Sequence, residues 1–419
     1  MGFTLGGLFF ALLFVGVPLG IAIGFASFAG LYFFGDVPLE IGAQRMIAGI
    51  RTFPLLAIPL FILAGNLMSA SGITKRIIDF AYAVVGSVRG GLSAVNILAS
   101  MVFGGISGSA LADTSAIGRL MIPSMVDRGY PASYSVAVTS VSATLAPLIP
   151  PSISLIVFGV MAQVSIVQLF FVGLLVGVIY ALVLMVTAYG IAVKRGQVAE
   201  ERLPLRAVLV ALRRAFWALL MPVIVLGGIR FGVFTPTEGG AIAVVYALFV
   251  GIVVHRDLHV RDLPKALVDS GVFVGVVMLI IAMASIFSWA LLIGQVPQNL
   301  TSMVFELTDS VLVILLLFNL FMLFIGMVVE TNAALIIFTP ILLPVMTSAG
   351  VDPIHFGIIF VFNLGLGLFT PPVGMCLLLG AKIGQLEMQD TLRDVVPFFI
   401  VGFFMLLAVT YLPLALGWF

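Results

Sequence analysis

The sequence reads APLIPPS over residues 146–152 and GLGLFTPPVG over residues 365–374, so a pair of consecutive prolines interrupts each of two apolar segments. Proline lacks a backbone N–H and clashes with the preceding helical turn, which leaves the carbonyl groups before each pair without helical partners. The flanking segments, 131–162 and 354–385, are apolar enough for a membrane, where irregular backbone persists only inside protein or beside a cavity. The two breaks therefore predict interrupted membrane helices that border a binding site.

The composition indicates a membrane protein. The 419 residues are 62% hydrophobic and 9% charged, whereas about a quarter of the residues of soluble domains are charged. The net charge of +1 excludes a basic nucleic-acid-binding surface, and the single cysteine, Cys376, excludes an intramolecular disulfide. The longest polar stretch, 194–206, is too short to fold alone. Any module that hydrolyses ATP or captures a ligand is therefore expected on another chain.

Apolar segments recur along the chain and predict an all-α polytopic membrane protein. Beside the two interrupted segments they lie at 3–16, 19–34, 53–71, 166–193, 215–234, 238–254, 267–294 and 395–417. Two pairs of shorter runs, 91–106 with 109–127 and 311–327 with 331–347, are each joined by a short tip. At 1.5 Å per residue, a helix of about 16 residues covers about 24 Å of a hydrocarbon core about 30 Å thick. Each pair therefore suggests a re-entrant hairpin, although two tilted spans remain the alternative. The amphipathic segment 73–89 predicts an interfacial helix.

The basic residues give an orientation. With the N-terminus outside and hairpins that do not cross, all but three of the 19 Lys and Arg residues lie on the cytoplasmic side, as the positive-inside rule requires. The exceptions are Arg45, Arg51 and Arg230. The first hairpin then opens to the cytoplasm and the second opens to the outside.

The two halves of the chain also resemble each other. A shift of about 221 residues places Gly105 on Gly326, Pro123 on Pro344, Gly129 on Gly350, and the first proline pair on the second. Similar halves with hairpins that open on opposite sides predict inverted-topology repeats, which are typical of secondary transporters.

The tip of the first hairpin, GGISGSALADT (104–114), is rich in small residues that form helices poorly. These residues are expected to free backbone carbonyls and amides and to add hydroxyls, which supply oxygen ligands for a hard cation such as Na+. The positive end of the following helix is suited to an anionic carboxylate. The alternative is a patch of small residues for close helix packing. Asp113 favours a site, because a carboxylate in lipid is costly unless it is solvated or paired.

The second tip, GMVVETN (326–332), carries Glu330 directly before a helix, followed by Thr331 and Asn332. These side chains are expected to bind an ion or simply to cap the helix. A cation between each tip and the facing break would satisfy the carbonyls that the prolines leave free, with help from the hydroxyl of Ser152 or Thr370. The familiar phosphate-loop and hydrolase motifs are absent, so no enzyme is predicted.

Six runs of the chain, in order, resemble the large membrane subunit of the tripartite ATP-independent periplasmic (TRAP) transporters. They are FPLLAIPLFILAG (53–65), SGSALADTSAIG (107–118), IPSMVDRGY (122–130), LIPPSISLIVFG (148–159), FTPTEGGAIAVVYAL (234–248) and LGLGLFTPPVGMCL (364–377). The resemblance implies an elevator-type fold in a bacterial or archaeal inner membrane. It also implies Na+-driven import of an organic acid: a C4-dicarboxylate, a sialic acid or another sugar acid. The implied partners are a periplasmic substrate-binding protein and a small four-helix membrane subunit.

The resemblance also implies a division of the chain and a set of site residues. Residues 91–162 and 311–385 would move against a scaffold made of 1–90 and 163–310, followed by a C-terminal helix at 386–419. One Na+ site is expected among Gly105, Ser107, Ser109, Ala146, Ile149 and Ser152, and a second among Gly326, Gly367, Thr370 and Val373. The substrate carboxylate is expected near Ser109, Asp113, Thr331 and Asn332. A carrier that works without a binding protein, an intramembrane enzyme and a channel are the alternatives.

Overall fold

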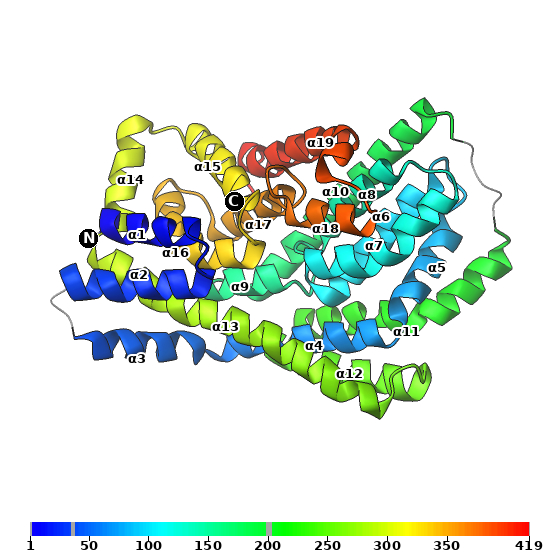
Figure 1. Cartoon of the computed structure of the whole chain (residues 1–419), viewed down its shortest axis with the longest axis horizontal. Coiled ribbons are helices and arrows are strands. Elements are labelled where there is room, and N and C mark those ends of the chain that lie inside the picture. The colour runs from blue at the N-terminus through cyan, green and yellow to red at the C-terminus, as the bar shows by residue number, and fades with distance from the viewer. Residues whose placement is uncertain (1, 35–37, 198–202, 419) are drawn as a thin grey trace.

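The computed structural model describes residues 2–34, 38–197 and 203–418, and within these ranges it is helical with no strand (Figure 1). Part of the polar stretch 194–206 thus lies outside the described residues. The α-helices are α1 (Gly2–Phe14), α2 (Leu19–Phe34), α3 (Leu39–Ile50), α4 (Ala57–Ala70), α5 (Ile73–Val85), α6 (Gly91–Ser107), α7 (Ala110–Asp127), α8 (Ala132–Ser142), α9 (Ile153–Met161), α10 (Ile166–Lys194), α11 (Leu205–Arg230), α12 (Pro236–Phe249), α13 (Leu263–Ile293), α14 (Val296–Leu307), α15 (Val311–Gly326), α16 (Thr331–Ser348), α17 (Pro353–Gly367), α18 (Met375–Ile383) and α19 (Met388–Ala415).

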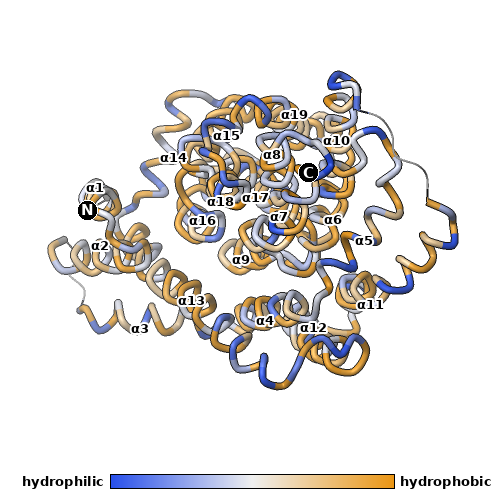
Figure 2. Tube along the Cα trace, turned by 45° about the vertical axis from the view of Figure 1, so that its right-hand side comes forward, coloured by the Kyte–Doolittle hydropathy of each residue, from blue (hydrophilic) through white to orange (hydrophobic). Residues whose placement is uncertain are grey.

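Most of the predicted apolar segments are helices, and seven helical stretches among the described residues are long and apolar enough to cross a membrane. Many large apolar side chains remain exposed, as lipid-facing helices require, and Figure 2 shows hydrophobic residues on the outer helices as well as inside. The all-α polytopic fold class is confirmed.

Three helices differ from the apolar segments read from the sequence. Helix α11 begins at Leu205, ten residues before the predicted segment 215–234, because its first turns carry several arginines that lower the local hydropathy. Helices α3 and α14 were not among the predicted apolar segments, since each is short and amphipathic. Packing stabilises both helices, because each lies against α13 and α14 also lies against α16.

The internal repeat is confirmed helix by helix. Helices α6 to α9 correspond to α15 to α18, and α7 and α16 begin at Ala110 and Thr331, which are 331 − 110 = 221 residues apart. The turns that leave the two hairpins match as well, because Gly129 and Gly350 both have left-handed φ angles, 84° and 81°. Glycine is favoured at both positions, since other residues pay a steric cost in this conformation.

The two hairpins open at opposite ends of the molecule, and α19 runs between these ends. Near the start of α19, Asp394 accepts a hydrogen bond from Ser133 Oγ at 2.6 Å and pairs with Arg195. Ser133 follows directly on hairpin 1. Near the end of α19, the Tyr411 hydroxyl donates to the Leu312 carbonyl at 2.9 Å, at the start of hairpin 2. The structure therefore has the inverted arrangement that the sequence predicts.

Single-cysteine labelling tests this arrangement in a membrane. Asp127 and Ser348 are equivalent, exposed residues at the open ends of the two hairpins. Because the basic residues place hairpin 2 toward the outside, a membrane-impermeant maleimide added to intact cells is expected to label Ser348→Cys and to leave Asp127→Cys unlabelled. The parent chain is the background control, since its cysteine, Cys376, is fully buried. Equal labelling of both variants from outside would contradict the inverted topology.

Candidate functional site

The tip of hairpin 1 is a tight turn of two residues. Helix α6 continues to Ser107, Gly108 takes a left-handed φ of 61°, and Ser109 caps α7 by accepting the Ala112 N–H at 3.4 Å. The tip is short, because most of the run 104–114 lies within α6 and α7. Gly104 stays helical because it packs against the facing break, where a Cβ on Gly104 would lie 2.8 Å from Ala146 Cα. This glycine therefore fills the packing role that was the alternative interpretation.

The backbone of hairpin 1 lies directly on the first break. A Cβ on Gly105 would lie 3.1 Å from the Pro150 carbonyl oxygen and 3.2 Å from Ile149 Cγ2. A Cβ on Gly108 would lie 3.0 Å from the Pro151 carbonyl oxygen. Only glycine allows this approach without a shift of the neighbouring backbone, and the result is that break carbonyls face the tip.

Ser152 closes the same break. Its hydroxyl accepts the Leu155 N–H at 3.3 Å as the N-cap of α9, and it donates to the Pro147 carbonyl. One carbonyl released by the prolines is thus satisfied within the break itself. The structure thus brings together most residues of the first expected Na+ site. Ser107 and Ser109 belong to the tip, and Ala146, Ile149 and Ser152 belong to the break that this tip meets.

Hairpin 2 meets the second break in the same manner. A Cβ on Gly367 would lie 2.2 Å from the Gly326 carbonyl carbon, so the two backbones touch. The Gly374 N–H donates to the Met327 carbonyl at 3.1 Å and ties the break to the tip. Thr370 Oγ1 donates to the Leu366 carbonyl at 2.6 Å and keeps its lone pairs available. Val373 lies in the same loop.

The two tips meet around a small cavity of about 10 Å³, room for roughly one water molecule. Both hairpins and both breaks contribute to its lining, which consists of Gly108, Ser109, Ala110, Leu111, Pro147, Ser154, Glu330, Thr331, Asn332 and Leu368. Ser109, Thr331 and Asn332, which the sequence placed at the substrate carboxylate, thus share one cavity.

A chain of hydrogen bonds crosses this cavity from one repeat to the other. Ser154 Oγ donates to Asn332 Oδ1 at 2.9 Å, and Asn332 Nδ2 donates to Glu330 Oε1 at 2.9 Å. Glu330 Oε2 accepts the Ala333 N–H at 3.0 Å as the N-cap of α16. Thr331 Oγ1 is buried and has no hydrogen-bond partner among the described residues. The cavity therefore contains a hydrogen-bonded chain of side chains from both repeats. The Thr331 hydroxyl lies beside this chain and takes no part in it.

Three helices begin at or beside this cavity. Ser109, Ser152 and Glu330 are the N-caps of α7, α9 and α16. Helix N-termini carry partial positive charge and free N–H groups, which favour an anion. Glu330 is the one ionisable side chain in the cavity lining, and in its ionised form it would favour a cation nearby. The arrangement suits an anionic group and a cation side by side.

Asp113 does not line the cavity. It lies one turn into α7 with 0% of its side chain exposed, and neither carboxylate oxygen has a hydrogen-bond partner among the described residues. Ser154 and Leu368 line the cavity although the sequence did not single them out. Ser154 was detectable as a second serine after the proline pair, whereas Leu368 carries no sequence signal.

A buried pair of asparagines was also missed. Asn363 Nδ2 donates to both Asn319 Oδ1 and the Asn319 carbonyl, at 3.0 and 2.9 Å. Asn319 in turn donates to Thr410 Oγ1 at 3.0 Å. These residues link α17 to hairpin 2 and to α19. The sequence signal for them is that each of the otherwise apolar segments that form α15 and α17 contains one asparagine.

Comparison with known proteins gives the family. The family model "Tripartite ATP-independent periplasmic transporter, DctM component" matches residues 7–415. The chain is 39% identical over 402 residues to the sialic acid TRAP transporter large permease protein SiaM of Vibrio cholerae, covering 96% of this chain and 94% of that protein. It is 40% identical over 371 residues to the C4-dicarboxylate TRAP transporter large permease protein DctM of Pseudomonas aeruginosa, covering 88% and 87%.

A solved structure supports the fold. The crystal structure of the Alcanivorax borkumensis YdaH transporter aligns with a TM-score of 0.70 at 12% sequence identity and covers 99% of each chain. That likeness shows the architecture alone. The family match and the relatives together show that this chain belongs to the DctM component family, the large inner-membrane permeases of TRAP transporters.

Proposed function

We propose that this permease imports an organic acid, in symport with Na+, after a periplasmic binding protein has delivered the acid. The observation that carries the proposal is the convergence of two hairpin tips and two proline breaks, from inverted repeats, on one cavity. Relatives at 39–40% identity are named for sialic acid and for C4-dicarboxylates, which supports an organic acid as the substrate class.

The proposed Na+ sites lie where each tip meets its break. Na+ is a hard cation that prefers oxygen ligands. The first site draws on Gly105, Ser107, Ser109, Ala146, Ile149 and Ser152. The second draws on Gly326, Gly367, Thr370 and Val373. The close backbone contacts at Gly105 and Gly367 support this assignment, because they bring carbonyl groups of tip and break together.

The substrate carboxylate is proposed to bind between the tips. Ser109, Thr331 and Asn332 line that space, and the N-termini of α7 and α16 would favour the negative charge. Thr331 Oγ1, buried without a hydrogen-bond partner in the part of the chain that the structure describes, could donate to a carboxylate oxygen. Asp113 is left out of the proposed substrate site, because it lies behind the cavity lining.

An elevator movement is the proposed route across the membrane. Residues 91–162 and 311–385 would move as one unit against the scaffold, 1–90 and 163–310, while residues 386–419 form the last helix. The scaffold meets hairpin 1 closely at Gly65 of α4, where a Cβ would lie 3.2 Å from the Ile106 carbonyl oxygen. The cavity between the tips is closed down to about 10 Å³, so a movement that carries the closed tips is more consistent with it than a channel.

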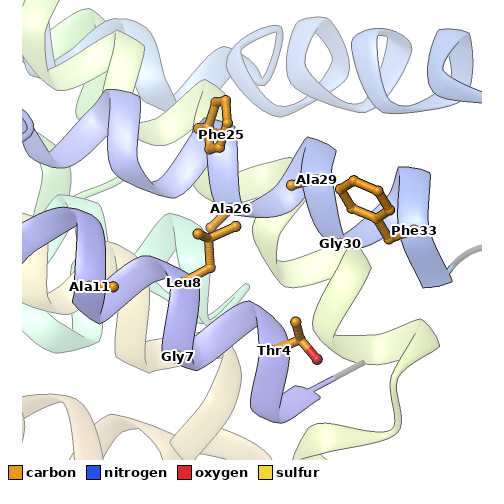
Figure 3. A pocket seen from close by; sticks show the side chains of 9 residues that line it. All are labelled: Thr4, Gly7, Leu8, Ala11, Phe25, Ala26, Ala29, Gly30 and Phe33. Atoms are coloured by element: carbon orange, nitrogen blue, oxygen red, sulfur yellow. The ribbon is translucent and has the colours of Figure 1, made fainter.

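The proposed partners are the binding protein and a small four-helix membrane subunit. The scaffold helices α1 and α2 form an exposed apolar groove whose lining includes Gly7, Ala11, Ala29 and Gly30 (Figure 3). Small residues allow a further membrane helix to approach closely. We therefore place the small subunit on the scaffold side of the molecule.

Substitution of Thr370 tests the second Na+ site. Thr370→Ala removes a hydroxyl at the break while leaving the helix packing nearly unchanged. We expect the Na+ concentration for half-maximal uptake to rise about threefold to tenfold, the loss of one ligand costing about 1 kcal/mol. Thr370→Ser, which keeps the hydroxyl, is the matched control. Unchanged Na+ dependence in folded Thr370→Ala would remove Thr370 from the site.

A further inference from the structure

A basic hollow of about 790 Å³ lies on the scaffold, and none of its lining residues belongs to the hairpin tips. It is formed by the first turns of α5, the first half of α11 and the loop that follows α12. Its lining includes Lys75, Arg213, Arg214, Trp217 and His255. Figure 2 shows hydrophilic residues on the outer part of α11, beside α5.

Three of the four basic side chains in this hollow have no acidic partner among the described residues. Arg76 is occupied, because its Nη2 pairs with Asp257 at 2.6 Å and its Nη1 donates to the Ser71 carbonyl at 3.1 Å. In contrast, Lys75, Arg213 and Arg214 form no ion pair in the described part of the chain. The lining contains four basic residues and two acids, so its net charge is +2 (4 − 2). The basic residues are Lys75, Arg76, Arg213 and Arg214, and the acids are Asp79 and Asp257.

His255 also lines the hollow, beside Arg76. Burial, and next the neighbouring Arg76 guanidinium, hold the pKa of His255 below its usual value, against a smaller opposite effect of Asp257. The imidazole is therefore neutral at pH 7. Its Nε2 atom is buried and has no hydrogen-bond partner among the described residues. The hollow thus contains a polar ring atom without a partner in the described part of the chain, beside a net positive charge.

An exposed apolar face of α11 adjoins the hollow. On α11, the buried side is formed by residues such as Ala215 and Ala218, whereas Leu209 and Phe216 are 56% and 46% exposed. Trp217 is half-buried at the edge, and its carbonyl accepts the Tyr246 hydroxyl at 2.7 Å. A basic hollow beside an apolar helix face matches the two parts of a phospholipid, a charged headgroup and acyl chains.

We infer that this hollow binds the headgroup of an anionic phospholipid of the cytoplasmic leaflet, with the acyl chains along α11. The cytoplasmic leaflet is the source of anionic lipid, and basic pockets between membrane helices on that side suit such headgroups. The basic residues of the hollow lie on the side that the positive-inside rule places in the cytoplasm. A soluble anion would explain the charge but not the exposed apolar rim.

The position of the hollow gives the lipid a structural role. Lys75 lies on α5, which leads directly into hairpin 1, while Arg213 and Arg214 lie on α11 of the proposed scaffold. A headgroup bound to all three would link α5, directly before the first hairpin, to α11 within the scaffold. This inference does not rest on the proposed Na+ coupling or on the identity of the substrate.

Native mass spectrometry of the full-length permease, delipidated in neutral detergent, tests the inference. The added lipids are phosphatidylglycerol and phosphatidylethanolamine with identical acyl chains, and inorganic phosphate is added as a competitor. We expect retention of phosphatidylglycerol over phosphatidylethanolamine, and a loss of about tenfold or more in its affinity in Arg213→Gln/Arg214→Gln. Both arginines are exposed, so the variant is expected to fold.

Arg261→Gln/Lys265→Gln is the matched control. It removes two exposed positive charges near the same end of the scaffold but outside the hollow, and its affinity for phosphatidylglycerol should stay within about twofold of the parent. Equal binding in the hollow variant and the parent, or equal retention of the two lipids, would overturn the inference. Full displacement of lipid by inorganic phosphate would overturn it in favour of a soluble-anion site.

Discussion

Gly367→Ala is expected to weaken Na+-driven uptake strongly. An added Cβ would lie 2.2 Å from the carbonyl carbon of Gly326 and 2.5 Å from its Cα, where no side-chain rotation can relieve the clash. The tip of hairpin 2 must then separate from the second break. Overpacking of this kind costs about 1–3 kcal/mol. Since both sides of the contact are proposed to supply Na+ ligands, we expect at least a tenfold rise in the Na+ concentration for half-maximal uptake.

Gly275→Ala is the matched control for this substitution. Gly275 lies in the middle of α13, and nothing lies within 4 Å of an added Cβ there. Alanine also favours a helix over glycine by about 1 kcal/mol, so this variant should transport as the parent does. Uptake in proteoliposomes and the thermal midpoint of each purified variant are measured together. Gly367→Ala with the Na+ dependence of the parent would show that the contact does not define an ion site.

Glu330→Gln is expected to have the second large effect. The carboxylate of Glu330 accepts hydrogen bonds from Asn332 Nδ2 and from the Ala333 N–H, and it is the one acid lining the cavity. Glutamine keeps an acceptor for the N-cap but loses the negative charge. If that charge stabilises a cation between the tips, its removal from a buried site should lower the apparent Na+ affinity about tenfold or more.

Glu306→Gln provides the comparison, because Glu306 is an exposed carboxylate near the end of α14. Its Na+ affinity should match that of the parent. The measurement is the Na+ dependence of initial uptake rates at saturating substrate. Glu330→Gln with unchanged Na+ affinity but tighter substrate binding would mean that Glu330 opposes the anion and does not serve the cation.

The hairpins, the breaks and their repetition were predictable because their signals are local. Consecutive prolines end a helix in any context, and a run of about 16 apolar residues is too short to cross a bilayer comfortably. The conformation of Gly104 was not predictable in this way. Its low helix propensity is overridden by packing against Ala146, which only the folded chain reveals.

The composition of the site was predictable in part. Ser109, Thr331 and Asn332 precede or begin helices, so cap patterns place them at the tips. Asp113 was expected beside them because it is close in sequence. Asp113 lies one helical turn beyond Ser109 and is therefore displaced along the axis of α7, and how far the cavity extends along this helix depends on tertiary contacts. For the same reason the sequence did not indicate that Ser154 reaches across to Asn332.

Uptake of labelled organic acids into proteoliposomes tests the central claim most directly. The vesicles contain this permease with its small subunit, and a mixture of sialic acid, C4-dicarboxylates and other sugar acids is offered with or without periplasmic extract. An inward Na+ gradient is compared with an equal K+ gradient. Our account predicts uptake only when Na+ and extract are both present. Uptake without extract would contradict it in favour of a stand-alone carrier, and equal uptake under the K+ gradient would contradict Na+ coupling.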